Sequence, residues 1–135
     1  MADWIYDQSG HPPIVVDGDR FLNRSGVTTI GWINGTEIFT VAGQHAGWFE
    51  DGVLSDLQNR WAGFTADATG ETPSRPAELR TRPMPDLGES PSQPDFGAAP
   101  IRPEPGGVSK IPLEYIFDDA QPLAPTVHSG YNYRP

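Results

Sequence analysis

The chain has 135 residues, no cysteine, 36% hydrophobic residues and a formal net charge of −9 at pH 7. The lack of cysteine excludes a disulfide framework, and the acidic balance argues against binding nucleic acid through phosphate contacts, which need clustered basic side chains. No stretch approaches the roughly eighteen apolar residues of a membrane span, and the first residues lack the basic and apolar regions of a secretory signal. We therefore expect a soluble protein made in the cytoplasm.

Residues 5 to 67 repeat one motif four times, which indicates a repeat architecture. Each unit opens on an apolar pair: Ile5-Tyr6, Phe21-Leu22, Ile38-Phe39 and Val53-Leu54. A first turn follows in each unit: Ser9-Gly10, Ser25-Gly26, Ala42-Gly43 and Gln58-Asn59. A large apolar residue then returns at a spacing of sixteen: Val16, Trp32, Trp48 and Phe64. The first three units close on a second turn: Asp17-Gly18, Asn34-Gly35 and Asp51-Gly52.

The residue types in each unit predict a two-stranded hairpin. Asn-Gly and Asp-Gly are favoured in type I′ turns, because both central residues need positive φ. The segments between turns have the usual length of strands and are rich in Ile, Val, Phe, Trp and Thr. Since a single hairpin is marginal in water, four units should pack around a shared centre. We predict an all-β fold of four hairpin repeats in a pseudo-fourfold closed arrangement, with eight short strands and the repeated aromatics near the axis or between units.

These elements resemble those of small bacterial domains described as four-fold β-flowers. The resemblance covers residues 4 to 67 and is carried by the apolar pairs, the Ser-Gly turns, the Gly-Trp steps at Gly31-Trp32 and Gly47-Trp48, and the Asp-Gly or Asn-Gly turns. It implies the same closed β fold and no established catalytic residues.

Composition divides the chain near residue 70. Residues 1–70 hold two of the fifteen prolines, and residues 71–135 hold the rest. Because proline removes a backbone donor and fixes φ, we expect 1–70 to be the four-repeat β domain and 71–135 an extended Pro-rich tail with docking segments. So small a head should need unusually good packing, self-association into a homo-oligomer, or a larger partner.

Nothing in the sequence assembles a reaction centre. His11, His45 and His128 lack the spacing of metal ligands. Glu50 and Asp51 are adjacent on a strand, so their side chains point to opposite faces and do not form a catalytic pair. We predict no catalytic residue, no metal and no cofactor.

The aromatic residues permit two interpretations. Trp32, Trp48, Phe64 and Trp61 could form a cage for sugars or quaternary amines, or the residues at the sixteen-residue spacing could be the core, which we favour. Trp61 lies outside that spacing, so we predict that it is exposed, with Trp4, and contacts a partner.

Two tail segments carry apolar side chains. Alternation along a strand would place Ile111, Leu113, Tyr115 and Phe117 on one face, and Tyr131 and Tyr133 would provide a second contact near the C-terminus. We predict that these residues bind a protein partner in an extended conformation, and that deleting residues 108–135 leaves the head folded. The alternative for residues 111 to 117 is that they fold back onto the head.

Together these features favour a non-enzymatic structural or accessory subunit of a larger assembly, in its most specific form a decoration or tail component of a phage virion. A ligand-binding module with an aromatic cage is the alternative. An enzyme would need a cluster of titratable groups that the sequence does not show.

Overall fold

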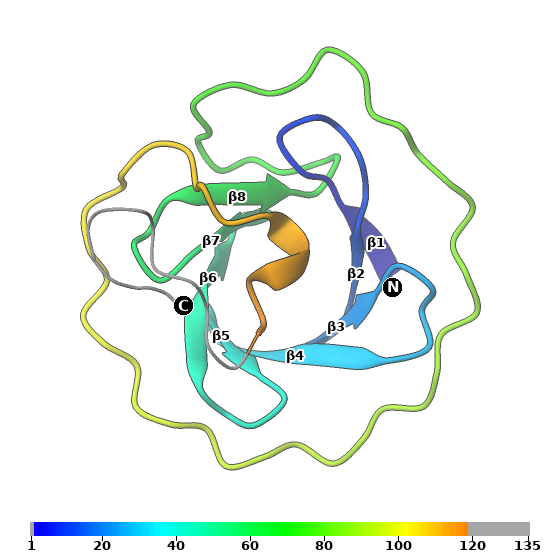
Figure 1. The fold of residues 1–135 in the computed structure, drawn as a ribbon, viewed down its shortest axis with the longest axis vertical. Coiled ribbons are helices and arrows are strands. Elements are labelled where there is room, and N and C mark those ends of the chain that lie inside the picture. Colours follow the sequence, from blue (N-terminus) through cyan, green and yellow to red (C-terminus); the bar gives the residue numbers. More distant parts are fainter. Residues whose placement is uncertain (1, 119–135) are drawn as a thin grey trace, which may run out of the picture.

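The computed structural model describes residues 2–118. One antiparallel sheet contains eight strands paired in chain order. Their bounds are β1 Ala2–Ile5, β2 Ile14–Asp17, β3 Arg20–Asn23, β4 Thr29–Asn34, β5 Glu37–Thr40, β6 His45–Glu50, β7 Val53–Ser55 and β8 Trp61–Phe64. A single 3-10 turn, Leu113–Tyr115, is the one helical segment of the described chain. This confirms the predicted all-β fold of short hairpins, and Figure 1 shows the strands arranged as a ring.

The ring closes between the first and last strands. The backbone N–H of Tyr6 donates to the carbonyl of Phe64 at 2.8 Å, and the N–H of Phe64 donates back at 3.0 Å. Closure removes the free edges that an open eight-stranded sheet would expose. The sheet is therefore a small barrel, as the fourfold repeat predicts.

The first turns repeat one hydrogen-bonding pattern. A side-chain oxygen at the start of each turn accepts a backbone N–H from within it, and such bonds are how Asp, Asn and Thr stabilise turns. The four acceptors are Asp7, Asn23, Thr40 and Asp56. Their spacing of 16, 17 and 16 residues matches the repeat. The same hydrogen-bonding pattern thus occurs in all four first turns. The fourth turn has Asn59 where the other three have glycine, and Asn59 has a positive φ of 57° as well.

Strand alternation separates an inner and an outer apolar layer. In the first unit Ile5 belongs to the inner cluster and Tyr6 to the outer one. In the fourth unit the order is reversed, since Leu54 lies in the inner cluster and Val53 in the outer one. Leu54 pairs with Gly63 as Phe21 pairs with Gly31, and each pairing is followed by a β-bulge. The repeat therefore holds in three dimensions with the fourth apolar pair shifted by one residue.

The inside of the barrel is filled by the chain's own C-terminal part. Residues 108–118, here called the plug, enter the ring, and Figure 1 shows the 3-10 turn at its centre. Ile111, Leu113, Ile116 and Phe117 are buried in the inner cluster. The ring of Phe117 lies 4.7 Å from that of Phe21, measured between centroids. The barrel core is thus completed by residues about fifty positions beyond the last strand.

Two inward-facing glycines make room for the plug. A Cβ at Gly31 would collide with the ring of Phe117, and a Cβ at Gly63 would come within 2.8 Å of a methyl carbon of Leu113. The recurring glycine before the aromatic residue therefore has a packing role in these two units.

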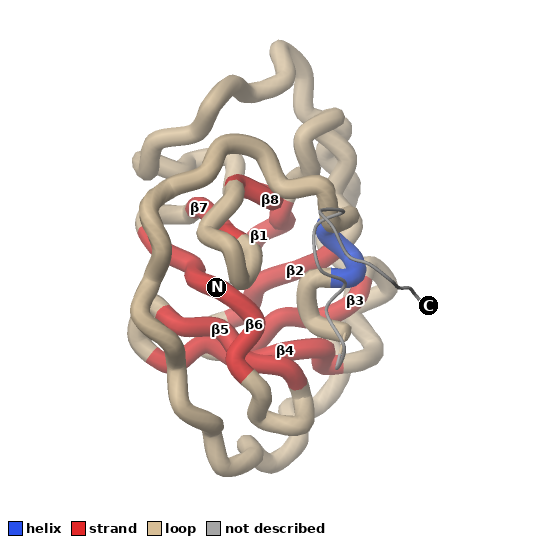
Figure 2. Tube along the Cα trace, turned by 60° about the vertical axis from the view of Figure 1, so that its left-hand side comes forward, coloured by secondary structure: helices blue, strands red, loops and turns tan. Residues whose placement is uncertain are grey.

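Residues 70–107, here called the strap, encircle the barrel (Figures 1 and 2). The strap donates one backbone hydrogen bond to a carbonyl in each first turn. Its donors are Arg80 to Gly10 at 2.9 Å, Gly88 to Gly26 at 2.7 Å, Gly97 to Gly43 at 2.8 Å and Gly106 to Asn59 at 3.2 Å. Prolines fit this role because an extended chain without internal hydrogen bonds leaves its remaining N–H groups free to bond elsewhere.

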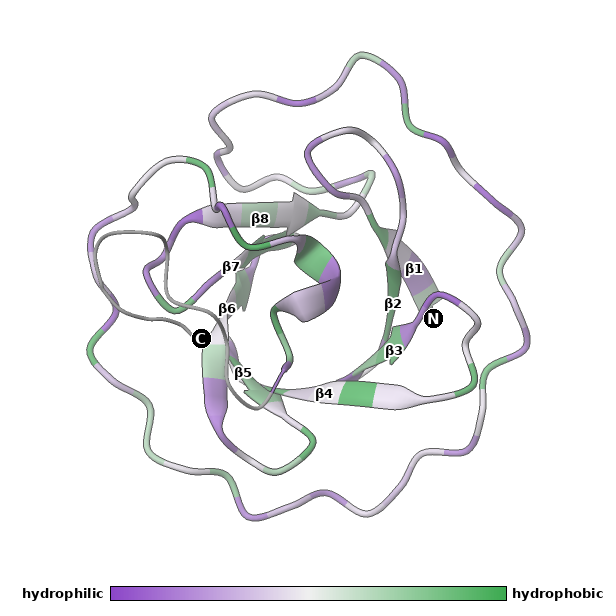
Figure 3. Cartoon of the chain, in the orientation of Figure 1, coloured by the Kyte–Doolittle hydropathy of each residue, from purple (hydrophilic) through white to green (hydrophobic). Residues whose placement is uncertain are grey.

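The strap carries its own repeat, in phase with that of the barrel. Pro85, Pro94 and Pro103 are nine residues apart, and each is followed by an acidic residue, an apolar residue and a glycine. Leu79 and Leu87 pack against the outer cluster, and the ring of Phe96 stacks on Phe39 at 4.5 Å between centroids. Figure 3 shows that most of the remaining strap is polar or neutral. The strap and the plug thus bury additional apolar surface of the small head within one chain.

The repeated aromatics lie on the outer side of the sheet, beneath the strap. Trp32, Trp48 and Phe64 are at most 2% exposed. The guanidinium of Arg102 lies 5.4 Å from the ring centre of Trp48, and that of Arg75 lies 5.3 Å from Phe64. The interpretation of these residues as core holds. Of the two places expected for them, near the axis or between units, the first is wrong. The glycine before each aromatic faces inward, so the aromatic itself faces outward.

The strap contact can be tested with matched glycine substitutions. Gly26 and Gly35 both have positive φ, 76° and 68°. A Cβ at Gly26 would lie 2.8 Å from the Asp86 carbonyl oxygen of the strap, whereas one at Gly35 meets no atom within 4 Å. In both alanine variants the free energy of unfolding should fall by about 1–2 kcal/mol, because alanine is strained in a left-handed backbone conformation. In Gly26→Ala it should fall by about 1–3 kcal/mol more, because of the collision with the strap. Urea unfolding followed by tryptophan fluorescence gives both values, and equal losses would contradict the strap contact.

Candidate functional site

The structure places the predicted tail anchors inside the protein. Ile111, Leu113 and Phe117 are 2–6% exposed, and Tyr115 is 49% exposed. The alternation expected of a strand does not apply, because residues 113–115 form a 3-10 turn. The prediction that these residues bind a partner is therefore corrected for the three buried side chains, which complete the barrel core, and only Tyr115 remains available. Tyr131 and Tyr133 lie outside the described residues.

The prediction that Trp61 is exposed is also corrected. Its side chain is 5% exposed and belongs to the outer cluster with Phe64, at 5.8 Å between ring centroids. Trp4 is 6% exposed, and its Nε1 donates to the Arg82 carbonyl of the strap at 2.8 Å. Both indoles are covered because the strap adds a layer that the repeat pattern alone does not reveal.

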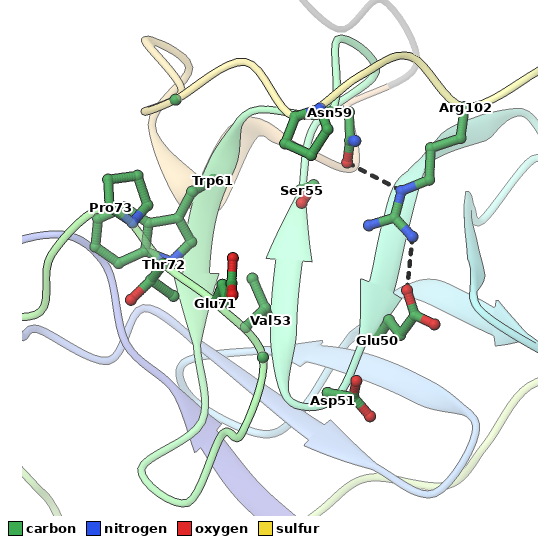
Figure 4. A pocket seen from close by; sticks show the side chains of 13 residues that line it. Glu50, Asp51, Val53, Ser55, Asn59, Trp61, Glu71, Thr72, Pro73 and Arg102 are labelled. Carbon is green, nitrogen blue, oxygen red and sulfur yellow. Dashed lines mark hydrogen bonds and ion pairs between the residues drawn. The ribbon is translucent and has the colours of Figure 1, made fainter.

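A cavity of about 390 Å³ lies where the strap begins and ends. Its floor is β7, with Val53 and Ser55, and Trp61 of β8 forms one wall. Thr72 and Pro73 from the start of the strap stand beside Trp61, and Arg102 from its end lies opposite (Figure 4). The cavity therefore lies between the two ends of the strap.

Acidic side chains surround this cavity. Glu50, Asp51 and Glu71 contribute carboxylates, and Arg102 contributes a guanidinium. Arg102 is bound within the protein, since its Nη1 donates to Glu50 at 2.7 Å and its Nε donates to Asn59 at 3.0 Å. The Asn59 amide in turn donates to the Pro103 carbonyl at 2.7 Å. One carboxylate is therefore neutralised and two are left, which gives the cavity a net negative charge.

Trp61 has an unsatisfied polar group at this site. Its Nε1 is buried and has no hydrogen-bond partner in the described part of the chain. Buried N–H groups without an acceptor are rare in folded proteins. From the sequence, Glu50 and Asp51 stand out only as a possible catalytic pair, and Glu71 and Arg102 are not recognised. No local signal marks these two residues, because the strap brings them to the barrel from far along the chain.

The pKa of His45 is displaced from its ordinary value. Its Nε2 lies 3.3 Å from a carboxylate oxygen of Glu37, and its ring lies edge-on to Phe39 and Trp48. Burial lowers the pKa of His45, and the charge of Glu37 opposes this lowering without cancelling it. Among residues 2–118 no group of three or more His, Asp or Glu side chains is placed to hold a metal ion.

The lowered pKa of His45 predicts a loss of stability in mild acid. The unfolded chain binds a proton near pH 6.5 and the folded chain binds it only at lower pH, so the unfolding free energy falls as pH drops below about 6.5. Urea unfolding at pH 7.5 and 5.5 measures this fall, which should be smaller in His45→Gln. His11→Gln, at a largely exposed ring, is the matched control. A pH dependence of His45→Gln equal to that of the parent would contradict the assignment.

Comparison with known families agrees with this architecture. A family model described as the 4-fold beta flower protein matches residues 3–130. The chain belongs to this family. The match extends past the four repeats through the strap and the plug, so these parts lie within the family's region as well. No curated protein and no solved structure matches the chain.

The exposed large apolar residues of this family member are distributed unevenly. Two lie in first turns, Val27 at 69% and Val41 at 48%, and none of those described lies in a second turn. The others belong to the strap and the plug: Met84, Ile101, Val108 and Tyr115, of which Ile101 is 95% exposed. The second turns present Asp, Asn, Thr and Glu. One end of the barrel is therefore apolar in part and the other end polar.

Proposed function

We propose that the protein is a non-enzymatic structural or accessory subunit of a larger assembly and that it binds a neighbouring protein with the first-turn end of the barrel. Its most specific form is a decoration or tail component of a phage virion. The proposal rests chiefly on the uneven distribution of exposed apolar side chains. Val27 and Val41 stand on adjacent first turns, where an apolar side chain gains nothing from the protein's own core.

The architecture supports a rigid docking body. The plug fills the barrel and the strap is bonded to all four first turns, so the turns that carry Val27 and Val41 are held in fixed positions. A pre-organised surface loses little conformational entropy when it binds. The proposed interface thus replaces the anchors Ile111, Leu113 and Phe117, which are part of the core.

The aromatic-cage alternative loses its original support. Trp32, Trp48 and Phe64 are buried, two of them beneath strap arginines, and a cage needs accessible ring faces.

The proposal is tested by sedimentation of the protein from its native source. Tagged protein at native abundance should travel with a large assembly, and the double variant Val27→Glu/Val41→Glu should shift to the slow, free fraction. Thr36→Glu/Ala66→Glu, which adds the same charge at exposed positions away from the first turns, should behave as the parent does.

Two outcomes would count against this function. Parent protein that sediments only as a free 14.7 kDa chain is not an accessory subunit. A double valine variant that is incorporated as well as the parent does not use the first-turn end for docking.

A further inference from the structure

The strap crosses the barrel over two equivalent polar pairs of different chemistry. In the second unit, Arg20 donates to Thr29 at 3.0 Å and to the Gly88 carbonyl of the strap at 2.7 Å. The corresponding pair in the third unit is Glu37 and His45, because the strands have the same register around an equivalent β-bulge. Of the two pairs, the one in the third unit contains a histidine, whose charge can change near neutral pH.

His45 is enclosed between the sheet and the strap. Its side chain is 4% exposed, and its ring lies edge-on to Phe39 at 5.5 Å and to Trp48 at 4.8 Å, measured between centroids. The strap covers both of these rings. Phe96 stacks on Phe39, and the guanidinium of Arg102 lies 5.4 Å from the ring centre of Trp48. The imidazole is therefore solvated only if the strap moves away at this place.

The surroundings of His45 disfavour its charged form. The Glu37 carboxylate on β5 lies 3.3 Å from Nε2 and attracts a proton, but no well-aligned hydrogen bond joins the two groups. From the strap, Arg102 brings a cation to the same Trp48 ring, and its charge is balanced by Glu50 of β6. Burial has the largest effect and lowers the pKa of His45. Because the imidazole binds its proton more readily when it is solvated, acid favours the state in which the strap is open.

We propose that strap residues 95–102, here called the third crossing, open in mild acid when His45 is protonated, while the rest of the strap stays closed on the barrel. Opening moves the imidazole into water and uncovers the outer faces of Phe39 and Trp48, next to the turn that carries Val41. The third crossing is thus a pH-sensitive cover over apolar surface. The opening does not depend on the docking function and is measured on the isolated chain, so either proposal can fail alone.

Two equivalent hydrogen bonds of the strap report on this opening. The Gly97 N–H donates to Gly43 at 2.8 Å within the third crossing, and the Gly88 N–H donates to Gly26 at 2.7 Å beside Arg20. Amide hydrogen exchange of the full-length protein, followed by NMR at pH 7.5 and 5.5, gives a protection factor for each amide. At pH 5.5 the protection factor of Gly97 should be lower by at least about threefold, because protonation favours the open state. That of Gly88 should be the same at both pH values.

Histidine variants assign the response to one ring. In His45→Gln the protection factor of Gly97 should no longer depend on pH, whereas His11→Gln, at a largely exposed ring, should respond as the parent does. The lower pH is kept at 5.5 because Asp and Glu side chains ordinarily titrate near pH 4. The comparison of Gly97 with Gly88 needs no variant. The proposal is overturned if the Gly97 amide of the parent is equally protected at both pH values, if Gly88 loses as much protection, or if His45→Gln keeps the parent's response.

Discussion

Replacing Phe117 with alanine should lower the free energy of unfolding by about 3–5 kcal/mol, the usual cost of removing a buried phenylalanine. The ring packs on Phe21 and occupies the space left by Gly31, so the surrounding barrel cannot readily close over the cavity. The total free energy of unfolding of a native protein is only about 5–15 kcal/mol. The variant should therefore unfold at a much lower urea concentration than the parent.

Tyr115→Ala is the matched control, because Tyr115 lies in the same plug with an exposed side chain. The free energy of unfolding of Tyr115→Ala should differ from that of the parent by no more than about 0.5 kcal/mol, as for other surface substitutions. Deletion of residues 108–135 removes four buried apolar side chains at once. Each contributes about 1.5–3 kcal/mol, so the truncated chain should not fold. This reverses the expectation from the sequence that the head folds without its tail. A truncated chain with a cooperative unfolding transition like that of the parent would show that the plug is dispensable.

Trp48→Ala should destabilise the protein by about 3–5 kcal/mol as well. The indole is 2% exposed and lies between the sheet, His45 and the guanidinium of Arg102. Its loss would open a cavity between the barrel and the strap and would free one end of the strap from its contact. Thermal or urea unfolding measured by far-ultraviolet circular dichroism is suitable, because the variant loses a fluorescent residue.

Arg102→Ala separates the contribution of the Trp48 indole to stability from that of the guanidinium that lies over it. It removes the cation above the ring and the partially exposed ion pair with Glu50, and each of these contributes about 0.5–1 kcal/mol near a surface. Trp48→Ala should therefore be the more damaging substitution by a wide margin. A folded Trp48→Ala variant with unchanged stability would mean that the ring is exposed in solution, as a ligand cage requires.

The strands and turns of the barrel could be predicted from the sequence because their causes are local. Asn34-Gly35 and Asp51-Gly52 both mark hairpin turns. The expected type I′ pattern, with positive φ at both residues, holds at Asp51-Gly52, whereas at Asn34-Gly35 only the glycine has positive φ. The short apolar segments between turns have few alternatives to strand pairing. The closure between Tyr6 and Phe64 follows from repetition, since each unit leaves an edge that the next one covers.

The direction of the side chains was harder to predict. Strand alternation specifies that Gly31 and Trp32 face opposite ways, but it does not say which of them faces the axis. A core made only of the four units would place the large ring inside. The plug takes that position instead, and the glycine faces inward because Phe117 needs its space.

The strap sequence contains a repeat whose meaning is clear only when its contacts with the barrel are known. The nine-residue spacing of Pro85, Pro94 and Pro103 looks like a feature of a Pro-rich linker. It has structural meaning because Gly88, Gly97 and Gly106, which donate hydrogen bonds to the first turns, are also nine residues apart. A contact between two repeats is a property of their relative placement, and no pattern within either repeat specifies it.

The sequence by itself determined a fourfold set of hairpins, a closed all-β fold and a tail of different composition. Those features depend on backbone preferences and on neighbouring side chains. Only the tertiary structure decided that the tail fills and encircles the barrel, that Trp61 is buried, and that Asp51, Glu71 and Trp61 surround one pocket. These features join residues far apart in the chain, and such contacts form because burying the apolar plug and the outer aromatics offsets the entropy lost on ordering the long strap.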